Sequence, residues 1–181
     1  GRRSNRIAFA IAGHVHRDDF RLFGDVPMLV APSVSPVYSN NPAFVRLDLT
    51  ADGTLQDYTP FDYSPWSHAW EAEPSFDETY GVRQFSANAL ASIHARLRSD
   101  ADLRERWARM FMSGSGNRQI TSWNWRTYWC AQTELADGFA ACAGLQRRVQ
   151  VLPIAAAVAG AAVLALLAFF AVRLGRGRRR V

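Results

Sequence analysis

The sequence predicts an α+β fold in which a strand-rich first third is followed by helices and then by a long apolar run. Short apolar runs separated by turn residues fill residues 7–58. Apolar residues at helical spacing dominate residues 86–111, and residues 151–172 carry no charge. We expect four parts along the chain: a sheet region at 1–63, a helical extension at 64–148, a transmembrane helix at 149–172 and a basic tail at 173–181.

The sheet region is defined by short apolar runs and by the turns between them. Three runs predict strands, the first of them buried, at residues 7–12, 20–23 and 27–31. Prolines and two adjacent asparagines predict an irregular loop at residues 31–42. Apolar and polar residues then alternate from Val45 to Thr50, and Asp52-Gly53 is a typical turn pair. We therefore expect a hairpin that returns through residues 55–58.

Two helices are predicted from polar cap residues that precede apolar stripes. Ser86 can accept a hydrogen bond at the start of a helix whose apolar face would hold Leu90, Ile93 and Leu97. Ser99 or Asp100 can begin a second helix that stops at Gly114, with an apolar face made of Leu103, Trp107, Met110 and Phe111. Aromatic stripes of this kind usually belong to a core rather than to a cofactor site.

The chain is basic only near its end. Its formal net charge is +5, yet residues 1–148 balance 16 basic against 16 acidic residues. The excess comes from the arginines between Arg173 and Arg180. A near-neutral globular part gives no electrostatic footprint for nucleic acid, so we expect no partner of that class.

The uncharged run from Val151 to Val172 predicts a membrane span. At about 1.5 Å per residue, a helix of this length crosses a hydrocarbon core of about 30 Å. A buried core helix is the alternative, but the arginines at both ends and the lack of a polar face favour a span. More arginines follow the run than precede it, so the positive-inside tendency places the tail in the cytoplasm. We expect a single-pass membrane protein whose globular part is periplasmic, extracellular or lumenal.

Cys130 and Cys142 are the only two cysteines, and they stand close together in the sequence. In an oxidising compartment the pair is most simply a disulfide that closes a small loop. Two free thiols are the alternative. A zinc pair is disfavoured because no histidine lies nearby in the sequence.

The clearest chemical pattern is "GHVH" at residues 13–16. In an extended backbone, His14 and His16 point to the same side, roughly 6–7 Å apart at the backbone, so both imidazoles can approach one metal or a close pair of metals. Gly13 leaves the backbone room to turn at the strand end. Asp18 and Asp19 are candidates for orienting the imidazoles by hydrogen bonds. A polar strand end without a metal explains the same residues.

The order of several segments resembles a known family. "FAIAGHVHRDDF", "VPMLVAPSVSPVYSNNPAFVRLDL" and "TLQDYTPF" resemble the closing half of a calcineurin-like metallophosphoesterase, and more narrowly its acid sphingomyelinase-like branch. "YGV", the two predicted helices and "CAQTELADGFAAC" resemble the C-terminal extension of that branch with its closing disulfide. The resemblance covers roughly residues 6–145. It implies the C-terminal half of a two-sheet sandwich, whose N-terminal half would belong to a longer protein.

The resemblance also implies a metal site. This family binds two divalent metal ions between the ends of its sheets, and His14 and His16 match its two last ligands, one for each metal. Imidazole ligands make zinc the first choice, with manganese, iron or cobalt as alternatives. The upstream aspartates, the Asn-His pair and the other histidine ligand of the family have no match in this chain. We therefore expect the fragment alone to be inactive.

Other residues are weaker candidates for contact with a substrate. Asn40 and Asn41 follow the predicted metal strand on a loop, although turn formation explains them equally well. His68 lies between two tryptophans and is a candidate for lining a substrate cleft, whereas His94 is expected to be structural. The cluster "SWNWRTYWC" at residues 122–130 is either core or a patch that faces lipid or substrate.

Together these observations predict a membrane-anchored, outward-facing enzyme that uses two metal ions to hydrolyse a phosphodiester or phosphoanhydride bond in a phosphate-ester substrate. The alternative is a non-catalytic, membrane-tethered remnant or binding module that keeps the C-terminal architecture without a metal site. The coding sequence upstream of Gly1 separates the two, because the enzyme requires an Asp-x-His strand end and an Asn-His pair there.

Overall fold

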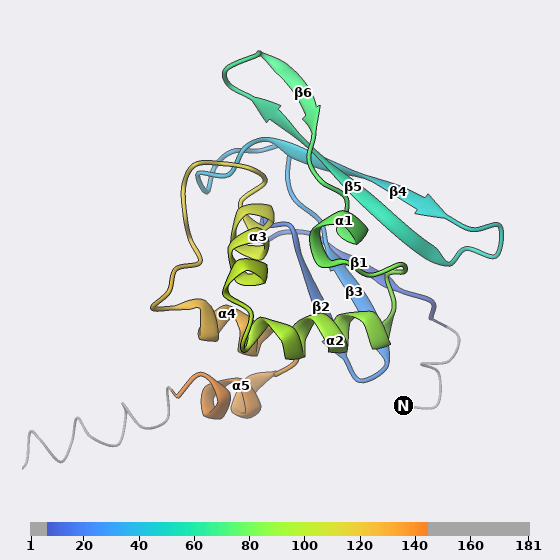
Figure 1. The fold of residues 1–181 in the computed structure, drawn as a ribbon, viewed down its shortest axis with the longest axis vertical. Helices are drawn as coiled ribbons and strands as arrows, with labels where there is room; N and C mark the ends of the chain where they lie inside the picture. Colours follow the sequence, from blue (N-terminus) through green and yellow to red (C-terminus); the bar gives the residue numbers. More distant parts are fainter. Residues whose placement is uncertain (1–6, 145–181) are drawn as a thin grey trace, which may run out of the picture. The chain divides into compact units, whose positions relative to one another are not determined.

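The computed structural model describes residues 7–144, which fall into two units, residues 7–135 and 136–144. The first unit holds six strands and the helices α1 to α4, and the described part of the second holds helix α5 (Ala136–Cys142). Figure 1 shows the order of these elements along the chain. The limits predicted at residues 63 and 148 stay predictions.

The first sheet is built from β1 (Ala10–Ala12), β2 (Asp19–Phe23) and β3 (Val26–Val30) in the order β1-β3-β2. β1 runs parallel to β3, and β2 runs antiparallel to it. The predicted buried first strand is therefore an edge strand, shorter than expected. Among residues 7–144, β1 pairs with β3 alone, and Ile11 is 53% exposed.

The second sheet is built from β4 (Ala43–Leu49), β5 (Leu55–Ser64) and β6 (Ala69–Ala72) in the order β4-β5-β6. The predicted hairpin is confirmed, and Gly53 at its turn has φ 82°, a conformation that glycine adopts without strain. β5 is longer than predicted and pairs antiparallel with β6, which the sequence did not indicate.

The two predicted helices are confirmed with their caps. Ser86 accepts a hydrogen bond from the Ala89 amide at the start of α2 (Ala87–Leu97). Asp100 accepts one from the Leu103 amide at the start of α3 (Ala101–Phe111). Three short helices were not predicted, namely α1 (Phe76–Tyr80), α4 (Trp125–Ala131) and α5.

One hydrophobic core holds the first unit together. α2 and α3 contact β2, and α1 contacts β5, so helices cover both sheets (Figure 1). The centre of the core is Trp107 of α3, whose side chain is fully buried. Both sheets contribute to the same cluster, the first through Phe20 and Leu29 and the second through Leu55 and Tyr58.

The predicted fold class needs correction. The described residues have an α+β fold, but its two sheets have three strands each and five helices accompany them, rather than half of a sheet-on-sheet sandwich. The physical reason is that helices supply the apolar cover that an opposing sheet gives in a sandwich: α2 and α3 contact the first sheet, and α1 contacts the second.

The predicted single-pass membrane location is also corrected. No helix among residues 7–144 is long and apolar enough to cross a membrane. The longest of them, α2 and α3, have 11 residues each, about half of the roughly 20 that a span requires. The apolar run at Val151–Val172 and the basic tail lie outside the described residues.

The two cysteines are joined as predicted. Cys130 and Cys142 form a disulfide, so neither is a free thiol. In a chain-entropy account, this bond stabilises the folded state by restricting the unfolded chain between the two residues.

Candidate functional site

His14 and His16 lie on the loop that joins β1 to β2. Both have left-handed backbones, with φ 83° at His14 and φ 55° at His16. Residues other than glycine adopt this region at a cost, and histidine is among those that tolerate it best. The extended backbone expected from the sequence is therefore replaced by a turned loop. The directions of the two imidazoles do not follow from the alternation of side chains along a strand.

The two imidazoles have few partners within the described part of the chain. His14 is exposed. His16 is partly buried, and its ring meets the ring of Tyr38 edge-on with centroids 5.1 Å apart. The Nδ1 atom of His16 is buried and has no hydrogen-bond partner among residues 7–144. Within the described residues, His14 is thus exposed to solvent, and His16 has a ring nitrogen without a hydrogen-bond partner.

Arg17, which follows the histidines directly, fixes the loop from inside. Its side chain is buried, and it donates to the carbonyls of His16 (2.8 Å) and Tyr38 (3.1 Å). It also donates to Gln119 Oε1 (2.6 Å) and to Asn40 Oδ1 (3.4 Å). Burial lowers the pKa of Arg17. Arg17 was not predicted as a site residue, and only its position beside the histidine pair signalled it.

Asp18 and Asp19 point into the core rather than toward the imidazoles. Asp18 accepts a hydrogen bond from the Tyr58 hydroxyl (3.0 Å), and burial raises its pKa well above the ordinary value. Asp19 accepts from Trp107 Nε1 (3.1 Å) and Gln132 Nε2 (3.2 Å) and pairs with Arg21. A role for either aspartate in orienting the histidines stays a prediction without a contact among the described residues.

Asn40 and Asn41 connect the loop after β3 to other segments. The amide of Asn40 donates to the carbonyls of Ser35 (3.1 Å) and Asn41 (2.9 Å), and its side chain is buried. Asn41 Nδ2 donates to Asp62 Oδ2 at 2.8 Å. Both residues therefore have structural bonds, as turn formation predicted, and contact with a substrate stays a prediction.

The two remaining histidines lie in different settings. His68 is exposed in the turn between β5 and β6, beside Trp66, which is 91% exposed. His94 stacks on Trp129 with centroids 4.2 Å apart, and its Nδ1 is 3.1 Å from Gln132 Oε1. Burial lowers the pKa of His94. His94 is structural, as expected, whereas His68 shares no contact with the histidine pair.

The aromatic cluster at residues 122–130 divides between two roles. Trp125, Tyr128 and Trp129 pack against the core, while Trp123 is 94% exposed. The core interpretation therefore holds for the part that belongs to α4, and Trp123 alone faces outward.

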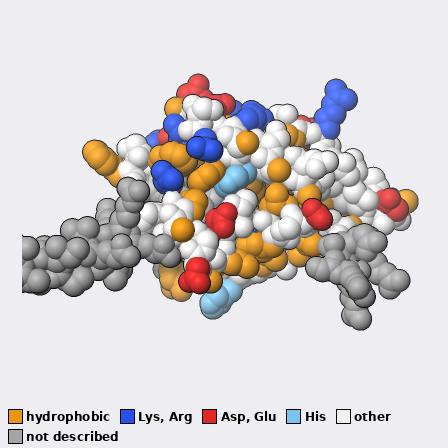
Figure 2. All heavy atoms as spheres, turned by 90° about the horizontal axis from the view of Figure 1, so that it is seen from below, with side chains coloured by type: hydrophobic (Ala, Val, Ile, Leu, Met, Phe, Trp, Pro, Cys, Tyr) orange, Lys and Arg blue, Asp and Glu red, His pale blue; other side chains and the backbone are white. Residues whose placement is uncertain are grey.

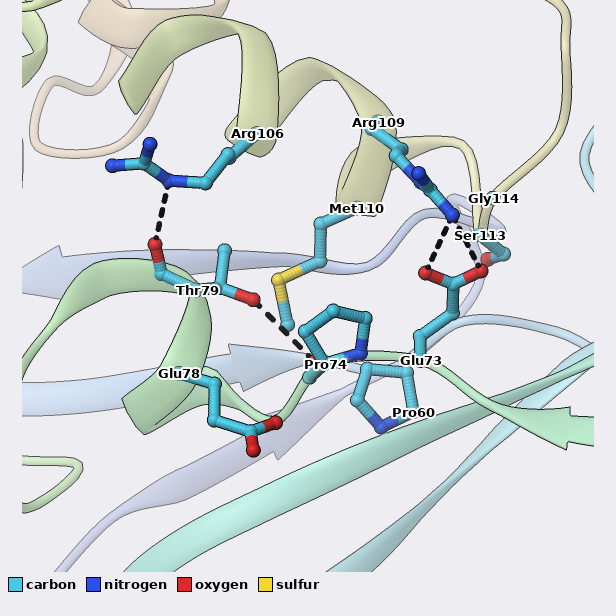
Figure 3. Close-up of a pocket in the computed structure, with 10 residues that line it drawn as sticks. All are labelled: Pro60, Glu73, Pro74, Glu78, Thr79, Arg106, Arg109, Met110, Ser113 and Gly114. Atoms are coloured by element: carbon cyan, nitrogen blue, oxygen red, sulfur yellow. Dashed lines mark hydrogen bonds and ion pairs between the residues drawn. The ribbon is translucent and has the colours of Figure 1, made fainter. Parts of the chain in front are cut away.

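The histidine pair is not joined by further metal-ligating side chains within residues 7–144. No three side chains of His, Cys, Asp or Glu within this range come together as a metal would require. On the face shown in Figure 2, basic, acidic and hydrophobic side chains are interspersed. A cavity of about 260 Å³ lies between β5, α1 and α3 and is lined by other residues than the histidine pair (Figure 3).

Comparison with known proteins does not assign the chain to a family. No family model matches the sequence, and no curated protein matches it significantly.

Proposed function

We propose that this chain forms part of a metal-dependent phosphoesterase in which His14 and His16 each bind one ion of a dinuclear centre. Two imidazoles cannot complete such a centre, so the remaining ligands would come from residues outside 7–144. Imidazole donors make zinc the first choice, with manganese, iron or cobalt as alternatives. When bound, the two ions would supply a hydroxide near neutral pH and neutralise the charge of a phosphodiester or phosphoanhydride.

The observation that carries the proposal is the contrast in bonding capacity along the loop. His14 is exposed, and His16 keeps a ring nitrogen without a partner among residues 7–144. Arg17 and Asp19 are hydrogen-bonded inside the fold, and Asp18 uses one of its two carboxylate oxygens there. Left-handed backbone at two non-glycine residues is a cost that functional loops often carry. Metal ligation is the chemistry that two adjacent imidazoles with spare nitrogens serve best.

Arg17 supports the proposal as a positioning residue. Its bonds to the His16 carbonyl and to Tyr38 hold the backbone that presents both imidazoles. A metal ligand loses affinity when its backbone is free to move, so a fixed loop favours binding.

The first experiment reads the coding sequence upstream of Gly1 for an Asp-x-His strand end and an Asn-His pair. The second expresses the full open reading frame and measures metal content and hydrolysis of a bis-nitrophenyl phosphate. His14→Ala and His16→Ala should each remove most of the activity, because a shared hydroxide requires both ions. Excess metal should restore part of it by mass action. His94→Gln, a histidine change away from the loop, should keep metal content and rate.

A second candidate function rests on the lack of a three-ligand group within residues 7–144. In that case the chain is a non-catalytic binding module, and the loop is a polar strand end. A full reading frame that binds no metal and hydrolyses no phosphate ester, or an upstream sequence without the expected ligands, would favour this module over the enzyme. Normal metal content and rates in both alanine variants would make the loop only a polar strand end.

A further inference from the structure

Four buried polar side-chain atoms lack hydrogen-bond partners among the described residues. Besides the atoms on His16 and Asp18, there are two that lie near the end of α3. One is Oδ1 of Asp62 in β5, a residue that is 5% exposed. The other is the hydroxyl of Ser113, which follows α3 and is 2% exposed. A buried polar atom without a partner costs free energy, so each of these atoms requires an explanation.

Two carboxylates converge on Gly114, the residue next to Ser113. A Cβ atom placed on Gly114 would lie 2.6 Å from Glu73 Oε1 and 3.1 Å from Asp62 Oδ2. Glycine, whose φ is 66° here, therefore leaves room for carboxylate oxygens that any other residue would displace. Figure 3 shows the Glu73 side chain reaching from the strand side toward Ser113 and Gly114.

The negative charge at this point is poorly compensated. Asp62 has no ion pair among residues 7–144, and Asn41 Nδ2 bonds only its Oδ2 atom. Glu73 pairs with Arg109 at 3.2 Å, but the Arg109 side chain is 67% exposed. Such a pair is screened by water and contributes little, so Arg109 can release Glu73 at small cost. The C-terminal end of α3 adds partial negative charge.

Ser113 is held in place by strained backbone. Its φ is 51°, in the left-handed region, and its amide donates to the Met110 carbonyl at 2.9 Å. A serine that adopts this conformation while its hydroxyl stays unpartnered combines two costs at one residue. Backbone strain and unsatisfied polar groups often occur at sites that bind a ligand.

We propose that Asp62, Glu73 and Ser113 form a binding site for a calcium ion. All three offer oxygen atoms, which suit a hard cation and exclude the nitrogen-preferring metals expected at the histidine loop. Calcium accepts irregular geometry and completes its shell with water and carbonyl oxygens, so two carboxylates and a hydroxyl are a sufficient protein contribution for weak binding. The site uses none of the residues of the histidine pair and does not depend on the proposed enzyme activity.

The test is a titration of the full 181-residue chain, freed of metal, with calcium by calorimetry and with terbium by luminescence. We expect one saturable calcium site with a dissociation constant of roughly 10⁻⁴ to 10⁻³ M, as in sites with few charged ligands. Asp62→Asn keeps the shape of the side chain and removes its charge, and it should weaken binding at least about tenfold. Asp48→Asn, an exposed aspartate of β4 in the same sheet, should bind as the unchanged protein does.

Circular dichroism shows whether Asp62→Asn folds. If it does not fold, two further variants still test the proposal. Glu73→Gln should weaken binding by about tenfold and Ser113→Ala by about two- to fivefold, since a hydroxyl is the weaker ligand. No saturable binding up to about 10 mM calcium, or equal affinity in all variants, would overturn the proposal and leave buried water as the partner of these atoms.

Discussion

Residues 14–16 and residues 17–19 are neighbours in the chain, yet they differ in burial and in hydrogen bonding. His14 is exposed and His16 has an unpartnered nitrogen, while Arg17, Asp18 and Asp19 are almost completely buried. Asp19 alone bonds two helical segments through Trp107 and Gln132. The histidines thus keep bonding capacity, Arg17 and Asp19 are hydrogen-bonded inside the fold, and Asp18 is buried with one of its two carboxylate oxygens bonded.

This difference shows why polar composition does not reveal a role. From the sequence, His14 and His16 were candidates for a metal site and Asp18 and Asp19 for its surroundings, whereas Arg17 was not a candidate. Burial decides between them, because a polar group inside the protein must find partners there, and those partners then occupy it. The predictions below test that division, starting with the largest expected effect.

Removing the carboxylate of Asp19 should cost the most stability. Asp19→Ala leaves the Trp107 indole, the Gln132 amide and Arg21 without their shared acceptor. Breaking a buried ion pair with hydrogen bonds costs about 3–5 kcal/mol. Urea unfolding followed by tryptophan fluorescence measures the loss. A change in the free energy of unfolding below about 1 kcal/mol is typical of an exposed site. Such a value would contradict the difference between residues 14–16 and residues 17–19.

Arg17 should be the next most sensitive position. Arg17→Lys keeps the charge, but an ammonium group cannot reproduce the planar set of bonds to Gln119, Asn40 and two carbonyls. Acceptors left without a donor cost about 1–3 kcal/mol. The free energy of unfolding should fall by this amount. Arg46→Lys on the exposed face of β4 is the matched control and should change little, because its pair with Asp48 is exposed.

Asp18 should make stability depend on pH. Burial raises its pKa well above the ordinary 3.8, so above that pH the folded protein keeps a proton that the unfolded chain has lost. Stability should therefore fall as the pH rises above 3.8, until the folded carboxyl ionises as well. Asn at position 18 does not titrate, so the free energy of unfolding of Asp18→Asn should not fall over this pH range. Relative to the unchanged protein, the variant should become more stable by on the order of 1 kcal/mol as the pH rises. Unfolding curves at several pH values measure the difference, and parallel curves for the two proteins would contradict it.

Local signals in the sequence were sufficient for much of the fold. The hairpin around Asp52-Gly53 and the helices that begin after Ser86 and Asp100 were predicted because turn and cap chemistry is contained in a few adjacent residues. β6 was missed because its four residues are all exposed and show no alternation. The predicted arrangement of the sheets was wrong because long-range packing decides whether a helix or a second sheet covers the apolar face of a sheet.

The candidate site was less predictable than the fold. The "GHVH" pair stood out by residue type, but the left-handed turn at His14 and His16 has no signature in the sequence. The cluster of Asp62, Glu73 and Ser113 went unnoticed because its members are far apart in the chain and meet only when β5 and the end of α3 pack together. Sites that combine distant residues are invisible to motif analysis.

The smallest effect is expected at His14. His14→Asn should change the free energy of unfolding by less than about 0.5 kcal/mol, because the imidazole is exposed and asparagine also tolerates a left-handed backbone. His16→Asn loses the edge-on contact with Tyr38 and should cost slightly more, about 0.5–1.5 kcal/mol. The same unfolding measurement used for Asp19→Ala compares all three variants. A loss of about 2 kcal/mol or more at His14 would mean that this side chain has a structural role in the fold, and only His16 would then be left on the loop for binding a metal.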